Sequence, residues 1–242
     1  MKRRKRIWLV PLCLLVLLLG SFFLYTAQYY HAGEAAKAAM IPDAAVQVQK
    51  TEMGWLFDGP SKENVLIFYP GAKVEETAYA PLLHDLAGKG MDVFLVSMPF
   101  RLAFFRMNGA GALMDSYHYD HWYIGGHSLG GAMAAVYAAR HPENLTGVVL
   151  LAAYPTKQLD EGLQAVTVYG SEDRVLNRKK LEQGRPFLPE KAVWLEIPGG
   201  NHAQFGDYGA QKGDGTASIS AQEQLRQTED VILNMMNEAS GT

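Results

Sequence analysis

The feature that most constrains the fold of this chain is the string G-H-S-L-G at residues 126–130, which lies between an apolar run and an alanine-rich run. Residues 122–124 have the character of a buried strand, and residues 132–139 have that of a helix. Where a strand turns sharply into a helix, glycines on either side of the turn remove Cβ atoms that would clash. The string therefore predicts a strand–turn–helix unit that exposes Ser128 at the turn.

Apolar runs and stretches of helical spacing alternate along the rest of the chain. This alternation is typical of an α/β domain, in which a mostly parallel central sheet carries helices on both faces. Before it, residues 45–49 and 54–59 have the pattern of an antiparallel pair of edge strands. No insertion is long enough for a large lid domain. The strands are expected at 64–69, 91–97, 121–125, 147–153, 165–169 and 192–197, and the helices at 76–88, 102–114, 129–140, 175–182 and 220–237.

A serine hydroxyl is a weak nucleophile near neutral pH and needs a base that a carboxylate orients. Asp173 follows the expected strand at 165–169, and His202 lies in a loop after the expected strand at 192–197. In parallel sheets, functional residues gather at the carboxyl ends of the strands. We therefore predict Ser128, Asp173 and His202 as the catalytic residues.

The other acidic and imidazole side chains near these positions are less suitable. Glu172 competes with Asp173, but a short side chain fits a loop after a strand better. His127 adjoins the serine and is expected to pack beneath the turn. The seven histidines show no H-E-x-x-H spacing, and the single cysteine, Cys13, lies in the apolar N-terminal run. We therefore expect neither a metal site nor a cofactor.

Stabilising an oxyanion takes two preorganised donors. Leu129 follows the serine at the start of the expected helix, where backbone amides lack intrahelical acceptors, so its N–H is one predicted donor. Ala72 is the other, because it lies in the loop after the strand at 64–69 and Gly71 lets that loop turn its amides toward the site. An ordinary Pro-Gly turn remains the alternative for this loop.

Three stretches together resemble the α/β-hydrolase superfamily. They are Y-P-G-A-K-V at 69–74, G-G-H-S-L-G-G at 125–131 and G-G-N-H-A-Q-F-G at 199–206. They look like a bacterial subgroup of small members without a lid, described as dienelactone-hydrolase-like or simply as α/β hydrolases. The resemblance implies the α/β-hydrolase fold and a Ser-Asp-His triad, but no particular substrate.

These residues predict a serine hydrolase that attacks an ester-like carbonyl of a small-molecule substrate and forms an acyl-enzyme intermediate. Thioesterase, peptidase and lactonase activities stay open, because the same residues serve them. A non-catalytic surface-binding protein on a hydrolase scaffold is the alternative from another class. A nearby apolar group is interpreted as core packing rather than an acyl pocket, and it comprises Phe100, Phe104, Phe105, Met107 and Met114.

The N-terminus has five basic residues before an uncharged apolar stretch that runs from Ile7 to about Tyr25. A helix of that length is close to the roughly 30 Å hydrocarbon core of a bilayer. We therefore expect a transmembrane signal anchor at 1–26, with a cleaved signal peptide as the alternative, a stalk at 27–43 and a catalytic domain at 44–242. The basic residues place that domain outside the cytoplasm, at the cell membrane or, after cleavage, secreted.

Composition narrows the partners further. The chain is 48% hydrophobic and 19% charged, and its net charge is −3. These values are typical of an ordinary globular protein and give no basic surface for nucleic acid. The oligomeric state is not predicted by the sequence.

Overall fold

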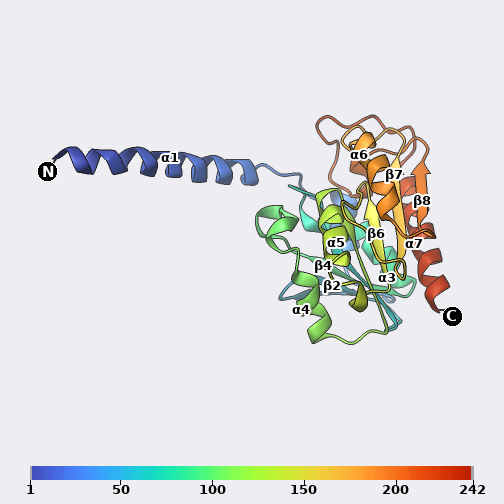
Figure 1. Cartoon of the computed structure of the whole chain (residues 1–242). Coiled ribbons are helices and arrows are strands. Elements are labelled where there is room, and N and C mark those ends of the chain that lie inside the picture. The colour runs from blue at the N-terminus through green and yellow to red at the C-terminus, as the bar shows by residue number, and fades with distance from the viewer. Residues whose placement is uncertain (1, 241–242) are drawn as a thin grey trace.

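The computed structural model describes the backbone of residues 2–240 and the side chains of residues 11–238. Its centre is an eight-stranded sheet in the order β1-β2-β4-β3-β5-β6-β7-β8 (Figure 1). β2 is antiparallel to β1 and β4, whereas β4, β3, β5, β6, β7 and β8 all run parallel. The predicted α/β fold, with a mostly parallel sheet and an antiparallel edge pair, is confirmed. No large lid covers the sheet in the described part of the chain.

The elements alternate along the chain as the apolar runs predicted. The strands are β1 Gln47–Thr51, β2 Gly54–Asp58, β3 Asn64–Tyr69, β4 Met91–Val96, β5 His121–His127, β6 Gly147–Leu151, β7 Gln164–Gly170 and β8 Val193–Ile197. The α-helices are α1 Lys2–Ala27, α2 Glu34–Ala39, α3 Ala80–Gly88, α4 Gly109–Ser116, α5 Leu129–Ala138, α6 Arg178–Gly184 and α7 Ala221–Ser240. Short 3₁₀ turns are η1 Glu76–Tyr79, η2 Pro99–Arg101, η3 Ala103–Phe105, η4 Pro142–Asn144, η5 Arg185–Phe187 and η6 Ala203–Phe205.

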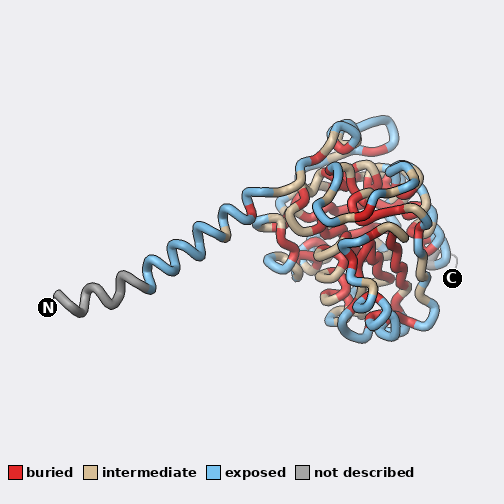
Figure 2. The backbone as a smooth tube through the Cα atoms, turned by 90° about the horizontal axis from the view of Figure 1, so that it is seen from above, coloured by how far each residue is buried: buried red, intermediate tan, exposed pale blue. Residues whose placement is uncertain are grey.

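The sheet separates two hydrophobic cores because its side chains alternate between its faces. On β3, Leu66 and Phe68 enter the core beneath α2, α3 and α7, whereas Val65 and Ile67 enter the core beneath α4 and α5. Every residue of β3 is buried, and Figure 2 shows buried residues through the interior of the domain. β3 and β5 are thereby held in the middle of the molecule, where the loops after them meet.

The prediction of one continuous helix at 102–114 is wrong. The chain forms η3, then an irregular turn, and only then α4. Tyr69 at the end of β3 explains the break, since its hydroxyl donates to Met107 O at 2.9 Å and accepts from Ala110 N–H at 3.1 Å. Backbone groups that would pair within a continuous helix are thus satisfied by a side chain from the sheet.

The prediction of a membrane anchor is also wrong. Crossing a bilayer takes about 20 consecutive, mostly apolar helical residues, and no helix in the described part of the chain meets the length and apolarity that a span needs. The transmembrane signal anchor, the membrane as a partner and the location at the cell membrane are therefore withdrawn. The basic run that preceded the predicted span lies outside the described side chains.

α1 projects from the domain, and the residues after it, in the segment expected as a stalk, contact the domain (Figure 1). Tyr30 pairs with Val74 as an isolated parallel bridge, and Tyr30 N–H donates to Lys73 O at 2.8 Å. Ala36 on α2 is fully buried, and its N–H donates to the Asp207 carboxylate at 2.8 Å. We therefore treat residues 30–43 as part of the packed domain.

Candidate active site

The turn that exposes Ser128 joins β5 to α5. Ser128 has φ 54° and ψ −120°, a backbone conformation that costs a non-glycine residue about 1–3 kcal/mol. Cβ atoms added at Gly126 or Gly130 would collide with the carbonyl oxygen of Tyr69 on β3. The glycines therefore allow β5 and α5 to approach β3, and this close packing holds the strained turn in place.

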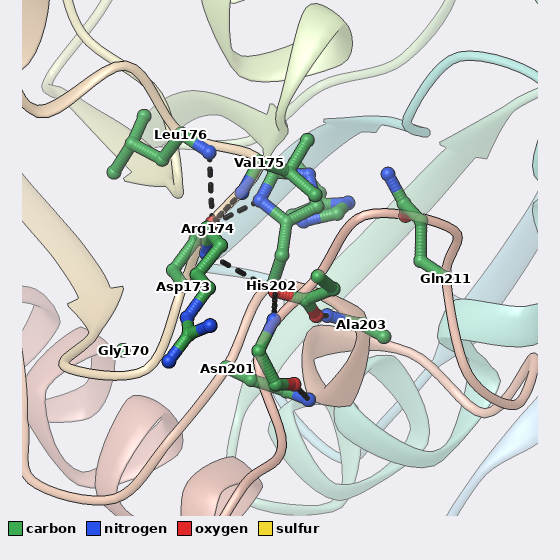
Figure 3. A network of polar contacts seen from close by, with 12 residues as sticks. Gly170, Asp173, Arg174, Val175, Leu176, Asn201, His202, Ala203 and Gln211 are labelled. Carbon is green, nitrogen blue, oxygen red and sulfur yellow. Dashed lines mark hydrogen bonds and ion pairs between the residues drawn. The ribbon is translucent and has the colours of Figure 1, made fainter.

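Asp173 and His202 form a buried pair beside this turn. His202 Nδ1 lies 2.8 Å from Asp173 Oδ2, and the two residues are only 1% and 4% exposed (Figure 3). Asp173 comes from the loop after β7, and His202 from the loop after β8. The carboxylate accepts the Nδ1 proton and so directs Nε2, the other ring nitrogen, away as an acceptor.

The second carboxylate oxygen of Asp173 is occupied by backbone amides. Val175 N–H and Leu176 N–H donate to Oδ1 at 2.9 and 2.8 Å. Figure 3 shows the carboxylate between these amides and the imidazole. Because one oxygen is fixed by the loop, the other can face only His202.

The loop that carries His202 is held by polar side chains from the C-terminal part of the chain. Gln224 on α7 accepts from Asn201 N–H at 2.9 Å and donates to Asn201 O at 2.8 Å. Asp214 accepts from Ala203 N–H at 2.9 Å. These bonds fix the backbone on both sides of His202.

Ser128 and His202 line the same pocket, which has a volume of about 280 Å³. His202 Nε2 is buried and has no hydrogen-bond partner among the described residues, and no hydrogen bond joins it to Ser128 Oγ. Hydrogen bonds between a nucleophile and its base are often long without substrate and tighten in the complex. The other lining residues are mostly apolar, namely Leu129, Ala132, Ala152, Ala153, Tyr154, Val175, Leu176 and Asn177.

The loop after β3 presents one unused amide. Gly71 N–H donates to Tyr79 Oη at 3.0 Å, and Lys73 N–H donates to Arg101 O at 3.0 Å. Among the hydrogen bonds of the described residues, none uses Ala72 N–H. Leu129 N–H is at the first position of α5, where no preceding turn offers a carbonyl. Both predicted donors are thus available.

His127 is buried beneath the turn, as its position predicted. Its Nδ1 lies 2.8 Å from Tyr79 Oη, and its ring centroid is 4.4 Å from that of His202. Burial, and then the neighbouring His202, hold the pKa of His127 well below its ordinary value, so this imidazole is neutral. Burial raises the pKa of the Tyr79 hydroxyl, which therefore keeps its proton.

The aromatic group interpreted as core packing is placed differently by the structure. Phe100, Phe104 and Phe105 are 42%, 47% and 47% exposed, and none lines the pocket beside Ser128. Phe100 and Phe105 instead pack edge-on against Phe22 of α1 at centroid distances of 5.1 and 6.2 Å. The sequence shows that these residues are apolar, but it does not show that α1 is the element they pack against.

Tyr79, Asp214 and Gln224 were missed by the sequence analysis. Each supports the site through a backbone or side-chain contact with a residue distant in the chain, and none belongs to a local motif. No group of three or more potential metal ligands occurs in the described part of the chain. The structure therefore brings Ser128, Leu129 and His202 to one pocket and pairs His202 with Asp173.

Comparisons with known proteins identify the family and the fold. A family model described as "Alpha/beta hydrolase family" matches residues 65–226, more than half of the 242 residues. The chain therefore belongs to the α/β-hydrolase family. No curated protein sequence matches it.

Several solved structures share the fold. Est1E from Butyrivibrio proteoclasticus is 12% identical with a TM-score of 0.57, covering 80% of this chain and 100% of that chain. Alpha/beta hydrolase domain-containing protein 10 from mouse is 12% identical with a TM-score of 0.57, covering 81% and 100%. The thioesterase domain from the curacin biosynthetic pathway is 13% identical with a TM-score of 0.53, covering 76% and 99%. At these identities the likeness concerns the fold alone.

Proposed function

We propose that this protein is a serine hydrolase of ester-like acyl substrates, with Ser128 as nucleophile, His202 as base and Asp173 as the residue that orients the base. The observation that carries the proposal is the buried 2.8 Å contact of Asp173 with His202, which lines the same pocket as Ser128. Membership of the hydrolase family makes hydrolysis the expected reaction class.

The proposed reaction uses these residues in turn. Ser128 Oγ transfers its proton to His202 Nε2 as it attacks the substrate carbonyl carbon, and the carbonyl oxygen becomes an oxyanion. The amides of Ala72 and Leu129 donate to that oxygen. His202 then protonates the leaving oxygen, the alcohol departs, and a water molecule that His202 deprotonates releases the acid from Ser128.

The lining of the pocket supports a neutral, apolar group next to the scissile bond. Ala132, Ala152 and Ala153 give it small walls, and its lining contains no acidic residue, lysine or arginine. A carboxylate or phosphate there would lose its hydration without gaining a partner. Uncharged esters are therefore the expected substrates, and thioesters are a second chemical class that the same residues could cleave.

The proposal is tested with a fluorophosphonate probe, which reacts with activated serines. We expect the intact protein to be labelled at one site and to hydrolyse p-nitrophenyl esters, and Ser128→Ala to lose both properties. Ser116→Ala is the matched control, because the exposed Ser116 hydroxyl bonds only Ala112 O within α4 and lies outside the pocket that Ser128 lines. Absence of labelling in the wild type, or equal labelling of Ser128→Ala, would refute the proposal.

A further inference from the structure

The residues beneath the loop after β3 form a hydrogen-bonded chain that joins the two halves of the site. Gly71 N–H donates to Tyr79 Oη at 3.0 Å, so the hydroxyl proton of Tyr79 must point away from Gly71. His127 Nδ1 lies 2.8 Å from Tyr79 Oη and is the atom toward which this proton points. All three residues are buried, and water is not available to replace either bond.

The direction of these bonds follows from the protonation of each group. His127 is neutral, and its Nδ1 accepts the Tyr79 proton, which leaves the ring proton on Nε2. A protonated His127 would need Nδ1 to donate to Tyr79, whose hydroxyl proton would then have no acceptor among these residues. It would also place a positive charge beside His202, which must itself become positive during the reaction. The donors and acceptors are therefore ordered from Gly71 N–H to Tyr79 and from the Tyr79 hydroxyl to His127 Nδ1.

Steric contacts fix the same residues. A Cβ atom at Gly71 would lie 2.7 Å from Tyr79 Oη and 2.9 Å from His127 Nδ1, so the loop rests directly on both side chains. Tyr79 is held in turn by Phe68 of β3, at a centroid distance of 5.1 Å. His127 packs between Tyr79 on one side and His202 on the other, at 5.7 and 4.4 Å between centroids.

From this geometry we infer that Tyr79 and His127 are positioning residues. They hold the loop so that Ala72 N–H faces the oxyanion, and the uncharged ring of His127 packs against His202 and keeps its imidazole in place. This inference rests on the proposed function. Neither side chain touches the substrate. Ala72 N–H makes no hydrogen bond among the described residues, and its loop is held on one side by the bond of Gly71 N–H to Tyr79 and on the other by the bond of Lys73 N–H to Arg101 O. The Tyr79 hydroxyl is therefore one of the two supports of this loop.

The first test is Tyr79→Phe, which keeps the ring and removes the hydroxyl. It leaves Gly71 N–H without its acceptor, and the loop can then turn Ala72 N–H away from the oxyanion. Because that amide acts mainly in the transition state, we expect kcat to fall about 10- to 100-fold and KM to change less than about threefold. Tyr123→Phe is the matched control with unchanged kcat, since the buried Tyr123 hydroxyl has no partner among the described residues.

A second pair of variants separates positioning from packing. His127→Asn keeps an acceptor near the place of Nδ1, whereas His127→Leu has a similar size and no acceptor. We expect His127→Asn to retain several-fold more kcat than His127→Leu at the same KM. Rates are divided by the concentration of sites that the fluorophosphonate titrates, so that loss of folded protein does not count as loss of kcat.

The outcomes distinguish this inference from the proposed function. If the wild type takes no label, the proposed function fails and this inference fails with it. If the wild type is labelled but Tyr79→Phe keeps kcat within about twofold, only the positioning role is refuted. Equal losses of kcat in His127→Asn and His127→Leu would refute it as well. If Tyr79→Phe does not fold, the comparison of kcat between His127→Asn and His127→Leu tests the positioning role alone.

Discussion

At the scale of single residues, the two oxygens of Asp173 have separate partners. Oδ1 accepts two backbone amides, and Oδ2 faces the imidazole of His202. An uncharged amide at this position would keep its oxygen toward the backbone donors, since they require an acceptor. Its NH₂ group would then face His202 Nδ1.

We therefore expect Asp173→Asn to fold and to lose kcat by roughly 10³- to 10⁴-fold, as a wrong imidazole tautomer does in serine proteases. With the amide donating to Nδ1, the ring proton moves to Nε2, and Nε2 can no longer accept the proton of Ser128. Steady-state ester hydrolysis and the rate of fluorophosphonate labelling measure this loss. Glu172→Gln is the control and should keep kcat within a fewfold. A larger loss of kcat in Glu172→Gln than in Asp173→Asn would indicate that Glu172, not Asp173, orients His202.

The positions of Ser128, Asp173 and His202 were accessible from the sequence because each follows an apolar strand in a recognisable string. Tyr79 was not, because its contact with His127 joins residues 48 positions apart and depends on how η1 packs against β3. Nothing in the residues around Tyr79 indicates that its hydroxyl meets a loop amide. Local patterns predict which side chains can react, and tertiary packing decides which ones support them.

At the scale of elements, the close approach of α5 to β3 sets the geometry of the site. Gly130→Ala would bring a Cβ atom against the carbonyl oxygens of Tyr69 and Pro70, which are backbone atoms that cannot move aside alone. We expect this variant to lose about 2–4 kcal/mol of unfolding free energy, in the range of overpacked core substitutions or above. Urea denaturation measures the loss.

Gly111→Ala serves as the control for that experiment. Gly111 lies inside α4, and a Cβ atom there would meet only the Tyr137 hydroxyl, at 3.5 Å. Alanine is the better helix former by about 0.5–1 kcal/mol, so this variant should be unchanged or slightly more stable. Equal destabilisation of both variants would show that the contact with β3 is not the cause.

The bounds of the strands were predicted better than those of the helices. β3 begins at Asn64 and is apolar or aromatic from Val65 to its end, as expected of a parallel strand buried on both faces. The break between η3 and α4 was not predicted, since it depends on the hydroxyl of Tyr69 from another element. Periodicity records which face of an element is buried, and it contains no information on side chains that interrupt the backbone from outside.

At the scale of the whole molecule, the buried neutral His127 links stability to pH. Its pKa in the folded protein is well below the ordinary value of 6.5, so the unfolded chain takes up a proton as the pH falls through about 6.5 and the folded protein does not. The stability that comes with neutral His127 is therefore present above about pH 6.5 and is lost as the pH falls below it, by up to about 1.4 kcal/mol per pH unit.

We expect His127→Asn to show a shallower decline of unfolding free energy than the wild type between about pH 6.5 and 5. Urea denaturation at several pH values measures both slopes. Parallel slopes would mean that His127 takes up a proton in the folded protein.

The packing of the N-terminal segment has a consequence for the order in which the chain can assemble. Ala36 and Asp207 lie 171 positions apart, and Tyr30 pairs with Val74 beside the loop that carries Ala72. Synthesis begins at the N-terminus, so the bond of Ala36 N–H to the Asp207 carboxylate can form only after most of the sheet has been made. His202 emerges at nearly the same time. An unfinished chain therefore lacks both the bond between Ala36 and Asp207 and His202, and the pocket that Ser128 lines is completed only late in synthesis.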